Sequence, residues 1–95
     1  MKALMIVDIE VTNPVRYEDY KRLASQAIAA HGGRYLVRGG ASEVLDGDWN
    51  PRRLVVLEFD SVEQAKAWRS SPEYTEAKKV REECARVNMV VVEGV

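Results

Sequence analysis

Lys2–Val11, near the start of the chain, constrains the fold most because apolar side chains occupy both sides of one strand-like stretch. Successive residues of a β-strand point to opposite sides of the sheet. One side of this stretch is apolar throughout and the other turns polar only toward its C-terminal end: the first set is Ala3, Met5, Val7, Ile9 and Val11, and the second is Leu4, Ile6 and Asp8. The sheet that contains this strand therefore has to be covered on both faces.

The remaining patterns give an element order that is typical of one fold class. Apolar residues at helical spacing follow Asn13-Pro14 and end at Gly32-Gly33, and a second helical region is interrupted at "SSPEY". This order predicts a single α+β domain over residues 1–95 with the ferredoxin-like βαββαβ topology, an antiparallel four-stranded sheet and helices on one face. The predicted elements are a strand at 2–11, a helix at 15–30, strands at 34–38 and 53–59, a helix from 62 that stops at the interruption and resumes at Pro72, and a strand at 87–93.

The second face of this sheet predicts a partner. If the more apolar side of each strand faces the helices, that side is formed by Met5, Val7, Ile9, Tyr35, Val37, Val55, Leu57, Phe59, Val90 and Val92. The other face is then aliphatic at its centre and charged at its margins, and consists of Leu4, Ile6, Asp8, Arg34, Leu36, Arg38, Leu54, Val56, Glu58, Met89, Val91 and Glu93. An exposed apolar patch of this size marks an interface, and the simplest partner is a second copy. We therefore expect a homodimer in which two sheets pack face to face as a dimeric α+β barrel.

Charged residues at the margins of that face are the first candidate site. We expect the first and third strands to be parallel neighbours, which would bring Asp8, Glu58 and Arg34 to one rim. Arg38 would lie at the opposite end of its strand, where its planar guanidinium could bind a carboxylate of the partner subunit or an anionic ligand. These residues are interpreted either as ion pairs that frame the dimer core or, for Asp8 and Glu58, as an acid–base pair with separated pKa values.

Four further residues have both a structural and a functional interpretation. His31, the sole histidine, is either a residue of a helix C-terminus or a general base. Trp68 and Tyr74 flank "RSSP" and either belong to the core or wall a small pocket between the helices and the sheet. Cys84 is either a nucleophile or a small buried hydrophobe, and the second is favoured because it lies on an apolar helical stripe with no base nearby in the sequence. No combination of residues has the spacing of a metal site or a phosphate-binding loop, and no cofactor is predicted.

The overall composition argues against several partners. Hydrophobic residues make up 46% of the chain and charged residues 31%, and the formal net charge is −1. Acidic and basic residues are interleaved, whereas a nucleic-acid-binding surface requires a basic face or stripe. No apolar run is long enough for a signal sequence or a membrane span, and the single cysteine cannot form an intramolecular disulfide, so a cytoplasmic location is expected.

Four stretches, taken in order, resemble the DUF1330 family of small uncharacterised proteins: "GGRYLVRGG", "GDWNPRRLVVLEF", "SVEQAKAWRSSPEY" and the terminal "VVVEGV". The resemblance covers nearly the whole chain. It implies a dimeric α+β barrel, in a group that also includes antibiotic-biosynthesis-type monooxygenases, muconolactone isomerases and stress-responsive barrel proteins. It carries no catalytic residues over to this chain, because one fold hosts many functions.

Three hypotheses about function follow. The first is a dimer that binds a small anionic or aromatic molecule, with Arg38, Trp68 and Tyr74 as the ligand-binding residues. The second is a cofactor-independent monooxygenase or isomerase, in which Arg38 would anchor an anionic group and a carboxylate of the rim or His31 would move protons. The third is a structural or regulatory dimer without a ligand. An Arg38 guanidinium that no carboxylate occupies favours the first two hypotheses.

Overall fold

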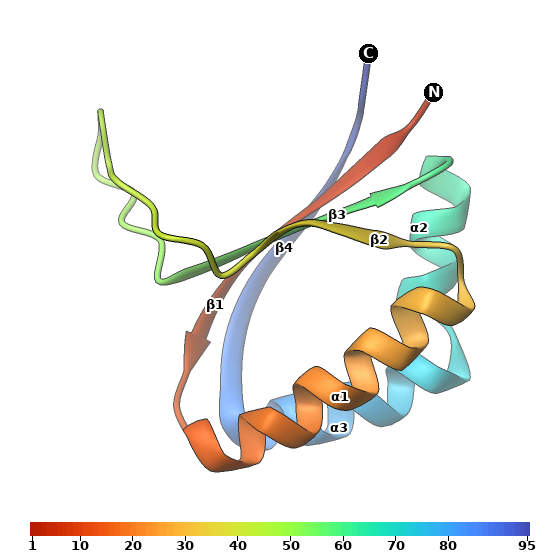
Figure 1. Ribbon diagram of the computed structural model, residues 1–95, viewed down its shortest axis with the longest axis horizontal. Coiled ribbons are helices and arrows are strands. Elements are labelled where there is room, and N and C mark those ends of the chain that lie inside the picture. The colour runs from red at the N-terminus through yellow and green to blue at the C-terminus, as the bar shows by residue number, and fades with distance from the viewer.

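The computed structural model describes residues 1–95 and has seven elements: β1 (Ala3–Val11), α1 (Pro14–Ala30), β2 (Arg34–Arg38), β3 (Arg53–Phe59), α2 (Val62–Arg69), α3 (Pro72–Cys84) and β4 (Ala85–Glu93). The strands form one antiparallel sheet in the order β2-β3-β1-β4. The helices lie on one side of this sheet, where α1 and α3 run beside each other, and the other side, here called the open face, carries no helix (Figure 1). This is the α+β ferredoxin-like fold that the element order predicts. The longest helix, α1, has 17 residues, and no helix has the length and apolar character of a membrane-spanning segment.

Each helix begins at a residue whose side chain caps it. Asn13 precedes α1, Ser61 precedes α2 and Ser71 precedes α3, and each side-chain oxygen accepts a hydrogen bond from the backbone N–H three residues later, at 3.1–3.2 Å. Pro14 and Pro72 follow two of these caps and fit the first helical turn, where no N–H donor is required. The cap at Ser71 explains why "SSPEY" separates two helices.

The direction of β3 differs from the prediction that β1 and β3 are parallel neighbours. The helical crossover through α1 makes β1 and β2 run the same way, and the chain then reverses between β2 and β3. β3 is therefore antiparallel to β1, with Asp8 opposite Leu54 and Leu4 opposite Glu58. The predicted rim cluster of Asp8 with Glu58 is consequently wrong, because the two carboxylates lie at opposite ends of the paired strands.

The face assignment of β4 was also wrong by one residue. Val91 pairs with Met5 and Met89 pairs with Val7, so Val91 and Met89 pack against the core on the helix-facing side. Val90 and Val92, expected on that side, lie on the open face and are 56% and 45% exposed. The run of three valines at 90–92 contains no alternation that could have set the register.

A bulge in β2 moves Arg38 to the helix-facing side of the sheet. Arg34 pairs with Glu58 and Tyr35 with Leu57, but the register shifts between Tyr35 and Val37, and Arg38 then pairs with Val55. Because side chains alternate with a period of two, one extra residue exchanges the faces of everything that follows. Arg34 and Arg38 were expected on one face, with Val37 on the other; the bulge separates the arginines and leaves Val37 on the open face.

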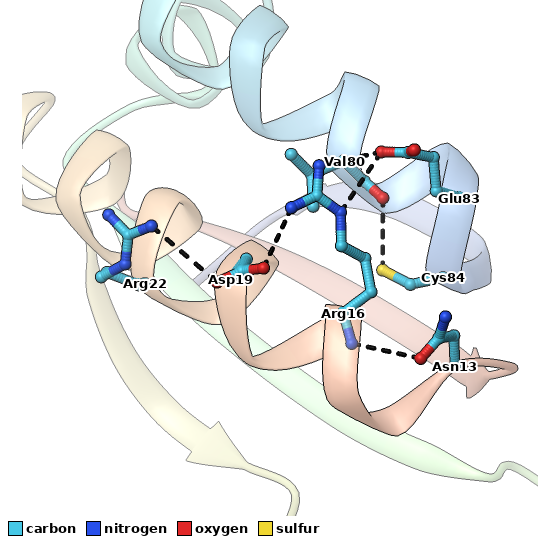
Figure 2. Close-up of polar contacts among 7 residues, drawn as sticks. All are labelled: Asn13, Arg16, Asp19, Arg22, Val80, Glu83 and Cys84. Atoms are coloured by element: carbon cyan, nitrogen blue, oxygen red, sulfur yellow. Dashed lines mark hydrogen bonds and ion pairs between the residues drawn. The ribbon is translucent and has the colours of Figure 1, made fainter.

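Arg16 of α1 joins the two long helices near one end (Figure 2). Its guanidinium donates to Asp19 Oδ2 at 2.9 Å within α1 and to Glu83 Oε2 at 3.0 Å in α3. Cys84 follows Glu83, is fully buried, and its thiol donates to the carbonyl oxygen of Val80 at 3.3 Å. Burial raises the pKa of the Cys84 thiol. Cys84 is therefore a packed, protonated core residue, as its place on an apolar stripe indicates.

Candidate functional site

A small cavity lies between α1 and the helix-facing side of the sheet. Its volume is about 30 Å³, which gives room for about one or two water molecules. Residues from α1, α2 and all four strands form its wall, so the fold as a whole builds the site rather than one local motif. The lining residues are Val7, Ile9, Tyr17, Tyr20, Lys21, Ala24, Ile28, Tyr35, Arg38, Arg53, Val55, Leu57, Trp68 and Met89.

Arg38 reaches the exposed side of the cavity because of the bulge in β2. Its Nη2 donates to Ser25 Oγ of α1 at 2.9 Å, and its guanidinium carbon lies 4.3 Å from the centroid of the Tyr35 ring. The Ser25 hydroxyl is also hydrogen-bonded to the Tyr35 hydroxyl at 3.0 Å. Arg38 forms no ion pair with any carboxylate. Neutral groups thus orient this guanidinium and leave its charge available to an anion.

Arg53, the first residue of β3, is the second cation of the cavity and likewise forms no ion pair. Its guanidinium carbon lies 5.7 Å from the centroid of the Tyr17 ring in α1. The guanidinium also packs against Gly39 so closely that a Cβ atom at that position would overlap Nη1. Lys21 is the third cation, but its Nζ is paired with Glu18 at 2.5 Å. Two arginines therefore line the cavity without a counter-charge.

Two residues of the cavity wall each carry a buried side-chain donor that has no hydrogen-bond partner. These donors are Arg53 Nε and Trp68 Nε1, and no other buried side-chain nitrogen or oxygen in the protein is left unpaired. A buried donor without a partner costs about 1–3 kcal/mol, so an acceptor that reached either nitrogen would stabilise the fold. No Asp, Glu, Asn or Gln side chain lines the cavity. Most of the lining is apolar and its charged groups are all cations, so any charge that a bound ligand carries there is favoured to be negative.

Tyr17 and Tyr20 of the wall add no negative charge. Burial raises the pKa of Tyr17, and Arg53 opposes this effect by stabilising the phenolate. Burial raises the pKa of Tyr20 far above its usual range, and the hydrogen bond between the hydroxyls of Tyr20 and Tyr74, at 3.0 Å, acts in the same direction. Both phenols are therefore protonated at neutral pH, and the charge of the lining is positive.

Of the three residues predicted to bind a ligand, Arg38 and Trp68 meet at this cavity and Tyr74 does not line it. Tyr74 is fully buried behind Trp68, with 4.5 Å between the ring centroids. Its hydroxyl accepts a hydrogen bond from Arg81 Nη1 at 3.0 Å in addition to its contact with Tyr20. Tyr74 thus supports the wall of the cavity from behind.

The two carboxylates considered as an acid–base pair lie on the open face, outside the cavity. Asp8 accepts hydrogen bonds from Trp49 Nε1 at 2.9 Å and from the backbone N–H of Arg52 at 3.0 Å. Glu58 forms an ion pair with Arg34 of the neighbouring strand, as expected for that pair. Asp8 thereby fastens the connection between β2 and β3 to the sheet, and Glu58 fastens β2 to β3.

His31 lies at the C-terminal end of α1 and also outside the cavity. Its Nε2 is 3.0 Å from Glu73 Oε1 of α3, and its carbonyl oxygen accepts a hydrogen bond from Gln64 Nε2 of α2 at 2.8 Å. These contacts join the ends of the three helices. They give His31 a structural role, and none of them brings its side chain to the cavity wall.

Arg53 is the residue of the site that the sequence analysis missed. In "RLVVLEF" it occupies the same side of the strand as Val55 and Leu57, both of which are buried. The available signal was that Arg53 is a charged residue on the side of the strand whose other members are apolar. Such a residue marks the end of the strand at which the helix-facing side becomes polar.

The chain matches the family model described as a domain of unknown function, DUF1330, over residues 2–95. The protein belongs to the DUF1330 family. None of the curated proteins matches the chain. Among solved structures, it is similar to RPA0582, a protein of unknown function from Rhodopseudomonas palustris, with a TM-score of 0.80 and 18% identity over 99% of this chain and 82% of that chain.

Two further solved structures share the fold of this DUF1330 protein. SnoaB, a cofactor-independent oxygenase from Streptomyces nogalater, superimposes with a TM-score of 0.67 and 11% identity over 99% of this chain and 93% of SnoaB. A dimeric ferredoxin-like protein of unknown function from Thermobifida fusca gives a TM-score of 0.67 and 18% identity over 99% of this chain and 92% of that chain. At these identities, the likeness concerns the fold alone.

Proposed function

We propose that this DUF1330 protein binds a small organic anion in the cavity between α1 and the sheet. The observation that carries the proposal is that the only two residues with an unpaired buried side-chain donor, Arg53 and Trp68, both line this cavity. Arg38 adds a second guanidinium without a carboxylate partner. A carboxylate or enolate would accept hydrogen bonds from donors of this wall and neutralise the local positive charge, whereas an ammonium ion would do neither.

The test is a thermal-shift screen of the purified protein against small carboxylic acids, phenolic acids and the neutral amides of the same acids. A ligand that binds only the folded state raises the stability according to its excess over the dissociation constant. We expect acids to raise the melting temperature and their amides to leave it unchanged. Equal shifts with acid and amide, or no shift with any acid, would overturn the proposal.

Variants of the two free arginines locate the site. Arg53→Gln and Arg38→Ala should each weaken acid binding at least tenfold, because each removes a charge and a donor from the anion. Arg22→Gln is the matched control. Arg22 lies on α1 and does not line the cavity, and 62% of its side chain is exposed. Urea denaturation of each variant establishes that the fold persists. Unchanged binding in both cavity variants would contradict the assignment.

We also propose that the protein is a homodimer that forms through the open face. The centre of that face is apolar, with Ile6 and Val37 both opposite Val56, while Val90 is 56% exposed beside them. The ferredoxin-like protein from Thermobifida fusca, which shares the fold, is described as dimeric. Burial of this apolar area against a second copy is the simplest cover for it.

The dimer is tested by light scattering on Val56→Glu, with Val15→Glu as the control. A glutamate at the centre of the interface would be buried without a partner, so we expect a monomer. Val15 lies on α1 and is 84% exposed, so its substitution should leave the dimer intact. A dimeric Val56→Glu protein would contradict the face-to-face arrangement.

A cofactor-independent oxygenase or isomerase reaction at the same cavity is the second candidate function. The likeness to SnoaB, which is described as a cofactor-independent oxygenase, favours it, together with a wall that holds Tyr17, Tyr20 and Trp68 around the site of the anion. An acid that stabilises the protein should then be consumed aerobically or isomerised in the presence of catalytic amounts of protein. A bound acid that is recovered unchanged would leave binding as the function.

A further inference from the structure

A shallow groove lies directly beside the cavity on the surface of the protein. Its volume is about 730 Å³, and it shares Tyr17, Lys21 and Arg53 with the cavity wall. The groove and the cavity therefore adjoin along these three side chains. Its remaining lining comes from the end of β1 and the first turns of α1: Val11, Pro14, Val15 and Glu18.

We propose that the natural ligand is a monocarboxylate with an apolar tail, whose carboxylate lies in the cavity and whose tail lies along this groove. The inference rests on the proposed binding of an organic anion and names the chemical class of that anion. Three features of the structure support it: the size of the cavity, the position of the groove and the character of the groove lining.

The cavity is large enough for the carboxylate group of the ligand and too small for the rest of it. A cavity that holds a benzene ring has a volume of about 150 Å³, whereas this one has about 30 Å³. A carboxylate group fits this space and an aromatic ring does not. The rest of the ligand must therefore lie outside the cavity, and the groove next to Arg53 is where a chain leaving the carboxylate arrives.

The lining of the groove favours an apolar tail and disfavours a second charge. Val11, Pro14 and Val15 provide apolar surface, and Val15 is 84% exposed, so a hydrocarbon tail would cover it. Glu18 and Lys21 of the groove pair with each other, so away from Arg53 the groove offers no free cation to a second carboxylate at the far end of the ligand. A dicarboxylate is thus a poorer fit than a monocarboxylate of the same length.

Calorimetric titration of an unbranched series tests the inference: butanoate, hexanoate and octanoate, with hexanedioate and hexanamide as comparisons. Each added methylene should strengthen binding by roughly two- to fourfold, as expected for partial to full burial of a CH₂ group. Hexanedioate should bind more weakly than hexanoate, and hexanamide should not bind. Affinity that does not rise with chain length, while the acids still bind, would overturn the inference and leave the proposed function standing.

A substitution in the groove tests the binding of the tail independently of the binding of the carboxylate. Val15→Asp should weaken octanoate binding at least tenfold and change butanoate binding little, because only the longer tail reaches the first turn of α1. Leu45→Asp is the matched control, since Leu45 is 89% exposed and lies outside both groove and cavity. Equal octanoate affinity in Val15→Asp and Leu45→Asp would contradict the groove. Failure of every acid to bind the unmodified protein would instead contradict the proposed function itself.

Discussion

Replacement of Gly39 by alanine should both destabilise the protein and disrupt its anion site. Gly39 follows β2 with a φ of +72°, a conformation that costs an L-residue roughly 1–2 kcal/mol. A Cβ atom at this position would also overlap Arg53 Nη1 and lie 2.5 Å from Arg53 Cζ. The guanidinium would have to move, and because it is the end of a flexible side chain the cost lies at the lower end of the roughly 1–3 kcal/mol typical of overpacking. The expected total loss is roughly 2–3 kcal/mol.

Two other glycines separate these contributions. Gly47 has a φ of +84° with no atom within 4 Å of the added Cβ, so Gly47→Ala measures the backbone cost alone. Gly40 has neither a positive φ nor a neighbour within that distance, so Gly40→Ala should change stability by less than about 0.5 kcal/mol. Gly39→Ala should exceed Gly47→Ala by the cost of moving Arg53.

Urea denaturation of the three variants gives these differences, and titration with hexanoate gives the effect on the site. Only Gly39→Ala should lose affinity, because it alone displaces a guanidinium that lines the cavity. If Gly39→Ala is no less stable than Gly47→Ala, or binds hexanoate as well as the unmodified protein, the argument that Gly39 holds Arg53 in place is refuted.

Three further predictions concern the supports of the site. Tyr74→Phe removes a buried hydroxyl that bonds to Tyr20 and accepts from Arg81, so it should lower the free energy of unfolding in urea by about 1–3 kcal/mol; a change below about 0.5 kcal/mol would contradict this. The hydrogen bond from His31 lowers the pKa of Glu73 below its usual value of 4.5, so its stabilisation is present above that value and is lost as the pH falls through the lowered pKa. The unmodified protein should therefore lose more stability between pH 5 and pH 3, taken as about the range of carboxyl titration, than Glu73→Gln does, and parallel losses would refute the contribution. The Cys84 thiol should react with a thiol reagent such as Ellman's only on unfolding, and reaction of the native protein at the rate of a free thiol would show that its burial is wrong.

The order and limits of the elements could be predicted because their signals are local. Asn13-Pro14, Gly32-Gly33 and "SSPEY" mark helix ends through capping and backbone preference, which depend on a few neighbouring residues. The faces of β4 could not be predicted, because consecutive valines at 90–92 suit either side of the sheet. The direction of β3 was predicted wrongly but could have been predicted correctly, because the crossover through α1 and the reversal after β2 determine it.

The site itself was only partly visible in the sequence. Arg38 was a candidate because it was expected at the margin of an otherwise aliphatic sheet face, but the β2 bulge that turns it toward Ser25 and Tyr35 has no local signature. Trp68 was expected near a pocket, yet its unpaired Nε1 follows from packing across several elements. Arg53 joins Arg38 only through strand pairing, which periodicity within one strand does not reveal.

The most direct test of the anion site is the proton NMR signal of the Trp68 indole N–H during titration with hexanoate. The protein has two tryptophans, and Trp49 provides an internal control because its Nε1 already donates to Asp8 at 2.9 Å outside the cavity. An acceptor in the cavity should move the Trp68 signal downfield with saturation and leave the Trp49 signal in place. A Trp68 signal that stays unchanged at saturating acid, or one that moves equally with hexanamide, would contradict the account.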